Sequence, residues 1–144
     1  NDILVDGKKV CGILTEMSAE MDAINYVIIG IGINVNNDNF PDELRDKSAS
    51  LKQLKGVEVS RIRVLASLLE KLESYYLMAE REGFEKIFDR WRELCINLGK
   101  NVRIVGKNVS FEGTAIDIDS AGALLVKTSS GKIERVLSGD VSLR

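Results

Sequence analysis

The chain has 144 residues, of which 44% are hydrophobic, and 20 basic and 22 acidic residues give it a formal net charge of -2. This length and apolar content suffice for one ordinary domain or two small ones with a buried core. The balanced charge gives no electrostatic signal for binding nucleic acid or an anionic membrane. No apolar run approaches the ~18 residues that a membrane helix needs, so we expect no membrane association.

Histidine is absent, and the only cysteines are Cys11 and Cys95. Zinc sites and Ser-His-Asp hydrolases need histidine or closely spaced cysteines, so both classes are strongly disfavoured, and no metal ligands are predicted. The cysteines lie in apolar surroundings and no signal peptide is recognisable, which indicates reduced thiols in the cytoplasm.

The first third of the chain predicts a β-hairpin followed by another strand. A short polar turn containing Asp-Gly separates two apolar runs, which is a strong hairpin signal. A third apolar run after a loop predicts a neighbouring strand. The predicted elements are strands at 3–5, 10–14 and 25–33, with a loop at 18–23. The asparagine-rich stretch at 34–41 is interpreted as a turn.

In the middle of the chain the hydrophobic period becomes that of amphipathic helices. A short helix at 50–55 is expected to end at Gly56, and two longer helices are expected between Ser60 and Gly83 and between Gly83 and Gly99. Their apolar stripes are predicted to face a core: Ile62, Leu65, Ala66, Leu69, Leu72 and Tyr76, then Phe84, Ile87, Phe88, Trp91, Leu94, Cys95 and Leu98.

After Gly99 the period returns to two, which indicates short strands separated by polar turns. They are expected at 102–104, 109–111, 114–118, 124–126, 133–136 and 141–143. Strands of this length and spacing are typical of a small SH3-like β-barrel. The predicted fold class is therefore α+β: residues 1–99 hold part of a mixed sheet with two packed helices, and 100–144 form the barrel.

The strand at 26–36 alternates two kinds of residue. Gly30, Gly32 and Asn34 share one face, while isoleucines and a valine occupy the other. Glycine inside a strand marks a place where a ligand or another backbone comes very close. On this pattern alone, a helix packed tightly against the glycines explains the strand equally well.

Three motifs, in order and with their spacing, resemble the biotin protein ligases: Asn1-Asp2, Lys9 to Glu16, and Ile29 to Asn36. The similarity runs through both long helices to the C-terminal tail. It implies that biotin reacts with ATP to give biotinyl-adenylate, and that the biotinyl group passes to a lysine of a biotin carrier protein. It also implies ATP, biotin and magnesium as cofactors and is compatible with a homodimer.

The resemblance assigns roles to individual residues. Lys9 matches the catalytic lysine, and the other matching positions that contact phosphates, metal, biotin or nucleotide are Asn1, Asp2, Gly12, Gly30, Gly32 and Asn34. Among these, Gly12 would lie against biotin, and Asn34 would hydrogen-bond the nucleotide. Arg103, Asp140 and Arg144 match positions that approach ATP or order the site in some relatives, but we interpret them as surface charges.

Other family features are not found in the sequence. The Lys-Trp-Pro that precedes Asn-Asp in the family is absent, as is its Gly-Arg-Gly-Arg type loop, and no helix-turn-helix suggests DNA binding. We therefore expect the second half of a ligase catalytic domain plus its SH3-like domain, inactive by itself. The alternatives are a stand-alone SH3-like interaction module and a related lipoate ligase.

Overall fold

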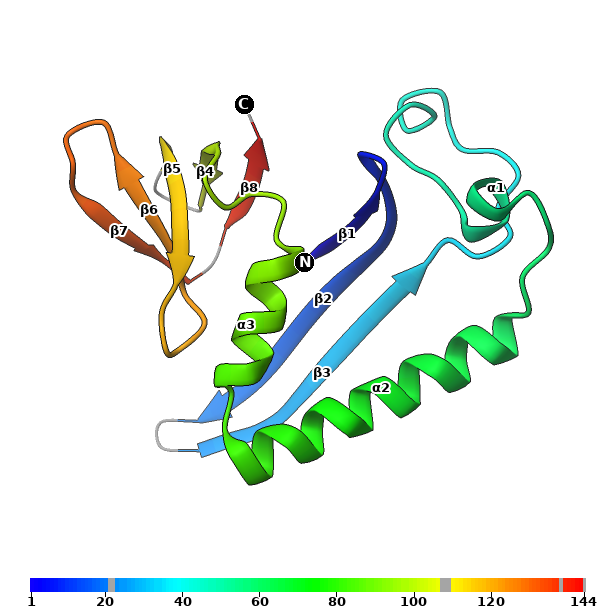
Figure 1. The fold of residues 1–144 in the computed structure, drawn as a ribbon, viewed down its shortest axis with the longest axis horizontal. Coiled ribbons are helices and arrows are strands. Elements are labelled where there is room, and N and C mark those ends of the chain that lie inside the picture. Colours follow the sequence, from blue (N-terminus) through cyan, green and yellow to red (C-terminus); the bar gives the residue numbers. More distant parts are fainter. Residues whose placement is uncertain (21–22, 107–109, 138, 144) are drawn as a thin grey trace. The chain divides into compact units, whose positions relative to one another are not determined.

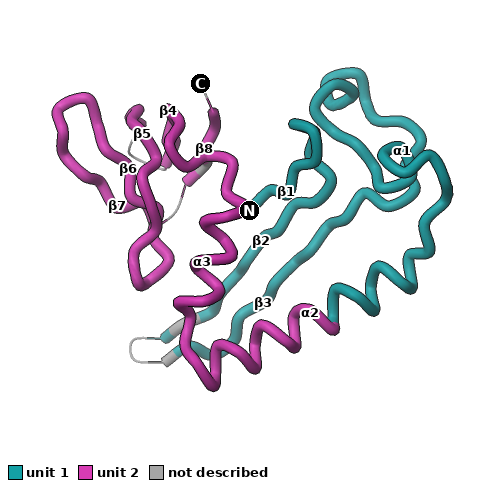
Figure 2. Tube along the Cα trace, in the orientation of Figure 1, with its two compact units in different colours: residues 1–69 teal, residues 70–144 magenta. Residues whose placement is uncertain are grey.

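The computed structural model describes residues 1–144 apart from 21–22, 107–109, 138 and 144 (Figure 1). Its elements are β1 Asp2–Val5, β2 Lys8–Glu20, β3 Ala23–Ile33, α1 Leu51–Lys55, α2 Arg61–Glu82, α3 Glu85–Leu94, β4 Asn101–Val105, β5 Ser110–Ile118, β6 Leu124–Thr128, β7 Ile133–Val136 and β8 Asp140–Leu143. Backbone contacts divide the chain into two compact units, residues 1–69 and 70–144, so α2 contributes to both (Figure 2). The domain boundary expected at residue 99 stays a prediction.

The first unit is built on a three-stranded sheet in the order β1-β2-β3. Asp6 and Gly7 form the first turn with φ of 50° and 77°, so the predicted hairpin is confirmed. The predicted loop at 18–23 is wrong for residues 18–20 and 23, which belong to β2 and β3, while 21–22 lie outside the described residues. Polar residues that alternate with apolar ones suit an exposed strand as well as a loop.

The core of the first unit lies on one face of β2 and β3. It consists of buried Val10, Cys11 and Ala49 with Ile13, Ile31 and Ile33 packed against them. The predicted apolar face of β3 is thereby confirmed for Ile31 and Ile33, whereas Ile29 is 54% exposed. The short helix α1 also has its predicted limits, because the Ser50 hydroxyl accepts a hydrogen bond from the Gln53 N–H and Gly56 ends the helix with a φ of 73°.

The apolar stripes of the long helices are not covered by the described residues. No residue of α2 is buried, and Ile62 is 80% exposed. The prediction that both stripes face a core is therefore wrong for α2, and for Phe84, Trp91 and Leu94 of the second stripe, which are also exposed. A stripe shows which residues can be buried, but not which partner buries them. None of the helices described is both long and apolar enough to cross a membrane.

The limits of α3 differ from the sequence expectation. The helix ends at Leu94 rather than near Leu98, because Cys95 has extended backbone angles. Leu98 nevertheless packs against the core of the second unit, which consists of Val102, Ile104, Ala115 and Val126. The segment between α3 and β4 is therefore held by the Leu98 side chain and by backbone hydrogen bonds of Gly99 and Lys100 with Ala115 of β5.

The second unit contains a five-stranded antiparallel sheet in the order β7-β6-β5-β4-β8. From residue 110 on, the strands predicted at 109–111 and 114–118 form one strand, β5. Gly113 permits this, because a Cβ there would lie 2.5 Å from the Lys127 carbonyl oxygen. No pairing between described residues joins β7 to β8, so a closed barrel is not found. The α+β class is confirmed, but pairing within both sheets is antiparallel, not mixed.

Arg92 of α3 ties the helix to β5 within the second unit. Its guanidinium donates to the Asp117 carboxylate at 2.8 Å, and this bond lowers the pKa of Asp117 below the ordinary value of 3.8. A carboxyl whose pKa is lowered in the folded state stabilises the fold above its ordinary pKa. That stabilisation is lost as pH falls through the lowered pKa.

We expect Arg92→Gln to lower the melting temperature at pH 7, and the difference from wild type to disappear as pH falls through the lowered pKa of Asp117. Thermal melts across this pH range measure both effects. Arg90→Gln is the control, because Arg90 pairs with exposed Glu93 of the same helix and should contribute little. Arg92 also pairs with Glu85 and Asp89 of its own helix. Equal losses in the two variants would show that Arg92 contributes no more than an ordinary pair within one helix.

Candidate functional site

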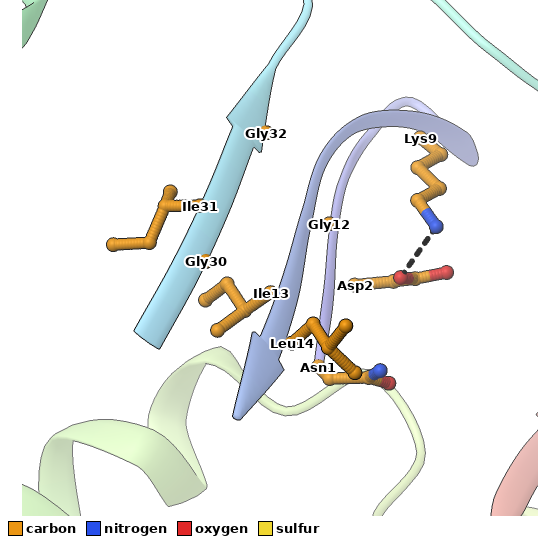
Figure 3. Close-up of a pocket in the computed structure, with 9 residues that line it drawn as sticks. All are labelled: Asn1, Asp2, Lys9, Gly12, Ile13, Leu14, Gly30, Ile31 and Gly32. Carbon is orange, nitrogen blue, oxygen red and sulfur yellow. Dashed lines mark ion pairs between the residues drawn. The ribbon is translucent and has the colours of Figure 1, made fainter. Parts of the chain in front are cut away.

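An open surface hollow of about 520 Å³ lies in the first unit, over β1, β2 and the end of β3 (Figure 3). It is lined by Asn1, Asp2, Lys9, Gly12, Ile13, Leu14, Gly30, Ile31 and Gly32. The lining includes the predicted catalytic lysine, the polar pair at the start of the chain and all three predicted strand glycines. The fold therefore brings residues of three separate sequence motifs to one place.

A β-bulge at Val10 sets the direction of the Lys9 side chain. The register of β1 with β2 shifts between residues 3 and 4, so Val10 has no partner in β1. One extra residue reverses the alternation of side chains beyond it. Without the bulge, Lys9 would share the core-facing side of Cys11. With it, Lys9 lies on the same face as Gly12, in the hollow.

The Lys9 ammonium is held by the Asp2 carboxylate. Nζ lies 2.7 Å from Oδ1, and the two side chains are 45% and 42% exposed (Figure 3). An ion pair this exposed contributes little to stability. The ion pair instead fixes the position of the Lys9 ammonium, which lies over the strand at Gly12.

The backbone of Lys9 is fixed independently of its side chain. Its N–H donates to the Lys47 carbonyl at 2.8 Å, and its own carbonyl accepts from the Ala49 N–H at 3.0 Å. The Asn34 side-chain amide donates to the same carbonyl at 3.4 Å. Lys9 and Ser48 form an isolated parallel bridge in the same region. Lys9 is therefore presented from a braced strand end and not from a free turn.

Gly30 and Gly32 are exposed, and nothing in the fold requires them to be glycine. Among the described atoms, a Cβ at Gly30 would meet only the Leu14 carbonyl oxygen at 3.6 Å, and one at Gly32 only the Gly12 carbonyl oxygen at 3.9 Å. Both are ordinary contacts, and neither glycine has a positive φ. The described residues place no helix against these glycines, and the close approach of a ligand to them stays a prediction.

The other predicted site residues lie outside the lining of the hollow. The side-chain amide of Asn34 donates a hydrogen bond to the Lys9 carbonyl oxygen. Contact of Asn34 with a nucleotide therefore stays a prediction. Arg103 is exposed on β4, opposite Glu112 of β5, and Asp140 begins β8 opposite Val105. Arg144 lies outside the described residues. The roles of the three residues in the second unit therefore also stay predictions.

Sequence reasoning missed the segment that braces Lys9. Residues 47–49 follow a polar loop and carry no periodic pattern, although Ser48 and Ala49 are buried. Their pairing with β2 is a contact between distant parts of the chain, which hydrophobic periodicity does not reveal. Ile13, Leu14 and Ile31 of the lining were also missed. Leu14 lies opposite Gly30 and shares its face, whereas Ile13 and Ile31 alternate with the glycines and also pack against the core.

The charges near the hollow limit its chemistry. Burial raises the pKa of the Cys11 thiol, an effect that Lys9 partly offsets, so this cysteine is not a thiolate nucleophile at neutral pH. No group of three or more metal-binding side chains occurs in the part of the chain that the structure describes. Asp2 is the only carboxylate of the lining. Because Mg²⁺ binds through one or two carboxylates together with substrate phosphates, Asp2 fits a magnesium ion that arrives with a nucleotide.

Comparisons with known proteins point to one family. Residues 98–144 match the family model for the biotin protein ligase C-terminal domain. The bifunctional ligase/repressor BirA of Bacillus spizizenii is 44% identical over 145 residues, a match that covers 99% of this chain and 44% of BirA. The chain thus spans less than half the length of this relative.

Solved structures give the same result over the whole chain. The apo biotin protein ligase of Aquifex aeolicus has a TM-score of 0.86 and 30% identity, covering 100% of this chain and 62% of that one. The same Aquifex protein in complex with biotin and ATP has a TM-score of 0.81 and 28% identity, with 59% of its chain covered. The chain described here therefore belongs to the biotin protein ligase family, and its residues 98–144 are the C-terminal domain of that family.

Proposed function

We propose that the complete protein containing residues 1–144 is an ATP-dependent biotin protein ligase. It joins biotin to AMP and then transfers the biotinyl group to a lysine of a biotin carrier protein. The observation that carries this proposal is a braced ammonium, Lys9, placed beside an open floor of glycine backbone. The likeness to a ligase that binds biotin and ATP supports the choice of small molecules.

In the first step, a carboxylate oxygen of biotin attacks the α-phosphorus of ATP. A new P–O bond forms, and the bond to the β-phosphate oxygen breaks, so that pyrophosphate leaves with the electron pair. Two anions meet, and charge accumulates on the α-phosphate oxygens. A preorganised cation at that point lowers the barrier, and Lys9 supplies it. Gly30 and Gly32 allow the adenylate to lie directly on the strand.

In the second step, the neutral amine of a lysine on the carrier protein attacks the acyl carbon of biotinyl-adenylate. An amide bond forms, the bond from the acyl carbon to the phosphate oxygen breaks, and AMP leaves with the electron pair. The amine gives its proton to solvent. Lys9 again stabilises the phosphate, now as a leaving group.

Asp2 takes part in this scheme as an exchangeable partner. In the absence of phosphates its carboxylate pairs with Lys9. Asp2 is the carboxylate of the hollow that would help to hold a magnesium ion, which would supply positive charge to the phosphates. The anionic α-phosphate competes with Asp2 for the Lys9 ammonium.

The complete protein, incubated with biotin, magnesium and ATP labelled at the α-phosphate, tests the proposal. We expect a biotin-dependent labelled product that migrates as biotinyl-adenylate on thin-layer plates. Calorimetric titrations with biotin and with lipoate separate the two acids, and we expect a response to biotin alone. Absence of the labelled product, or a lipoate-dependent adenylate in its place, would contradict the proposal.

A further inference from the structure

The far end of the Lys9 side chain lies in the space that a side chain at residue 12 would occupy. A Cβ at Gly12 would be 3.1 Å from Lys9 Cε, 3.2 Å from Lys9 Nζ and 3.7 Å from Asp2 Oδ1. Gly12 does not have a positive φ, so its backbone does not demand glycine. Glycine is required here because the end of the Lys9 side chain lies against residue 12.

This contact differs from those of the other glycines in the hollow. A Cβ at Gly30 or Gly32 would meet only a backbone oxygen, at ordinary distance. At Gly12 the nearest atoms are those of the reactive cation itself. Asp2 pairs with Gly12 across the β1–β2 ladder, so the carboxylate and the missing side chain lie side by side. The Asp2 carboxylate and the open space at Gly12 together define one position for the Lys9 ammonium.

We propose that Gly12 is a positioning residue for Lys9: its lack of a side chain leaves the space in which the ammonium lies beside Asp2. This inference rests on the proposed function, in which Lys9 is the catalytic cation. It assigns Gly12 an effect on biotin activation that passes through Lys9 and does not arise from direct contact with biotin.

A methyl group at residue 12 must displace the end of Lys9, because real Cβ contacts below 3.4 Å are rare. Displacement of a catalytic group by a fraction of an ångström to about 1 Å costs up to roughly 100-fold in rate. We expect Gly12→Ala in the complete protein to slow adenylation by about 10-fold to 100-fold. The dissociation constant for biotin should not change. The melting temperature should also be nearly unchanged, because the displaced atoms end a flexible, half-exposed side chain.

A double-mutant cycle with Lys9→Gln decides how Gly12 acts. If the effect passes through Lys9, Gly12→Ala should cause no further loss of adenylation rate in the Lys9→Gln background, measured by single-turnover formation of labelled biotinyl-adenylate. The same loss in both backgrounds, or an equal rise in the biotin dissociation constant in both, would overturn the proposal. A large fall in melting temperature would also overturn it, since the methyl group would then meet rigid structure.

A second measurement does not depend on catalysis. Acylation of lysines in the ligand-free protein, followed by mass spectrometry, compares Lys9 with neighbouring Lys8 in the same molecule. We expect Gly12→Ala and Asp2→Asn each to raise the labelling of Lys9 relative to Lys8. The first displaces the Lys9 ammonium and the second removes its ion pair. An unchanged ratio would refute the placement of Lys9. If both variants raise Lys9 labelling as expected but the wild-type protein forms no biotinyl-adenylate, the proposed function fails while the placement of Lys9 stands.

Discussion

Lys9→Gln is expected to slow formation of biotinyl-adenylate by about 100-fold to 1000-fold in the complete protein. A preorganised charge at a developing anion contributes about 3–4 kcal/mol to catalysis, and glutamine keeps a polar side chain, one atom shorter, but not the charge. Folding should be unaffected, because the bonds from residue 9 to Lys47 and Ala49 are made by backbone atoms. Single-turnover assays with labelled ATP and a thermal melt measure the two quantities.

Lys8→Gln is the matched control for this variant. Lys8 precedes Lys9 on β2 but does not line the hollow, so its loss should leave the rate within a factor of about two. Lys9→Arg should restore the rate only in part, because a planar guanidinium cannot place one compact charge where an ammonium sits. Unchanged turnover in Lys9→Gln would remove this residue from the mechanism.

Gly32→Val is expected to weaken ATP binding strongly while leaving the fold intact. The hollow has room for the side chain in the ligand-free protein, since the nearest atom to a Cβ at Gly32 is the Gly12 carbonyl oxygen at 3.9 Å. A nucleotide lying on the strand would collide with it. Overpacking typically costs 1–3 kcal/mol, so the dissociation constant should rise by about 10-fold to 100-fold.

Calorimetry with a non-hydrolysable ATP analogue and thermal melts separate binding from stability for this variant. Thr15→Val is the control, because it places the same side chain at an exposed position on β2 outside the hollow. It should bind the analogue as wild type does. If Gly32→Val instead lowers the melting temperature and keeps normal affinity, the glycine serves packing and not ligand approach.

Local patterns predicted the parts of the fold that depend on neighbouring residues. The Asp-Gly turn, the alternation along β3 and the ends of α1 all follow from chemistry within a few residues. The glycine pattern of β3 is also visible in the sequence, but it left a packed helix and a bound ligand equally open. The limits of α3 were not, since Cys95 leaves the helix although the apolar pattern continues.

What the sequence did not predict depends on register and on distant contacts. A simple alternation would place Lys9 on the side of Cys11, and only the bulge at Val10 turns it into the hollow. The contact of Lys9 with Gly12 depends on this bulge, and the backbone bond from Ala49 to Lys9 joins distant parts of the chain. The exposed stripe of α2 shows the same limit, because periodicity identifies an apolar face but not its partner.

A crystal structure of the complete protein with a non-hydrolysable biotinyl-adenylate analogue tests the central claim most directly. We predict that the analogue lies on the backbone of Gly30 and Gly32, with Lys9 Nζ within about 3 Å of an oxygen of its phosphate or phosphate mimic and no longer paired with Asp2. An analogue bound elsewhere, with Lys9 still 2.7 Å from Asp2, would contradict the account.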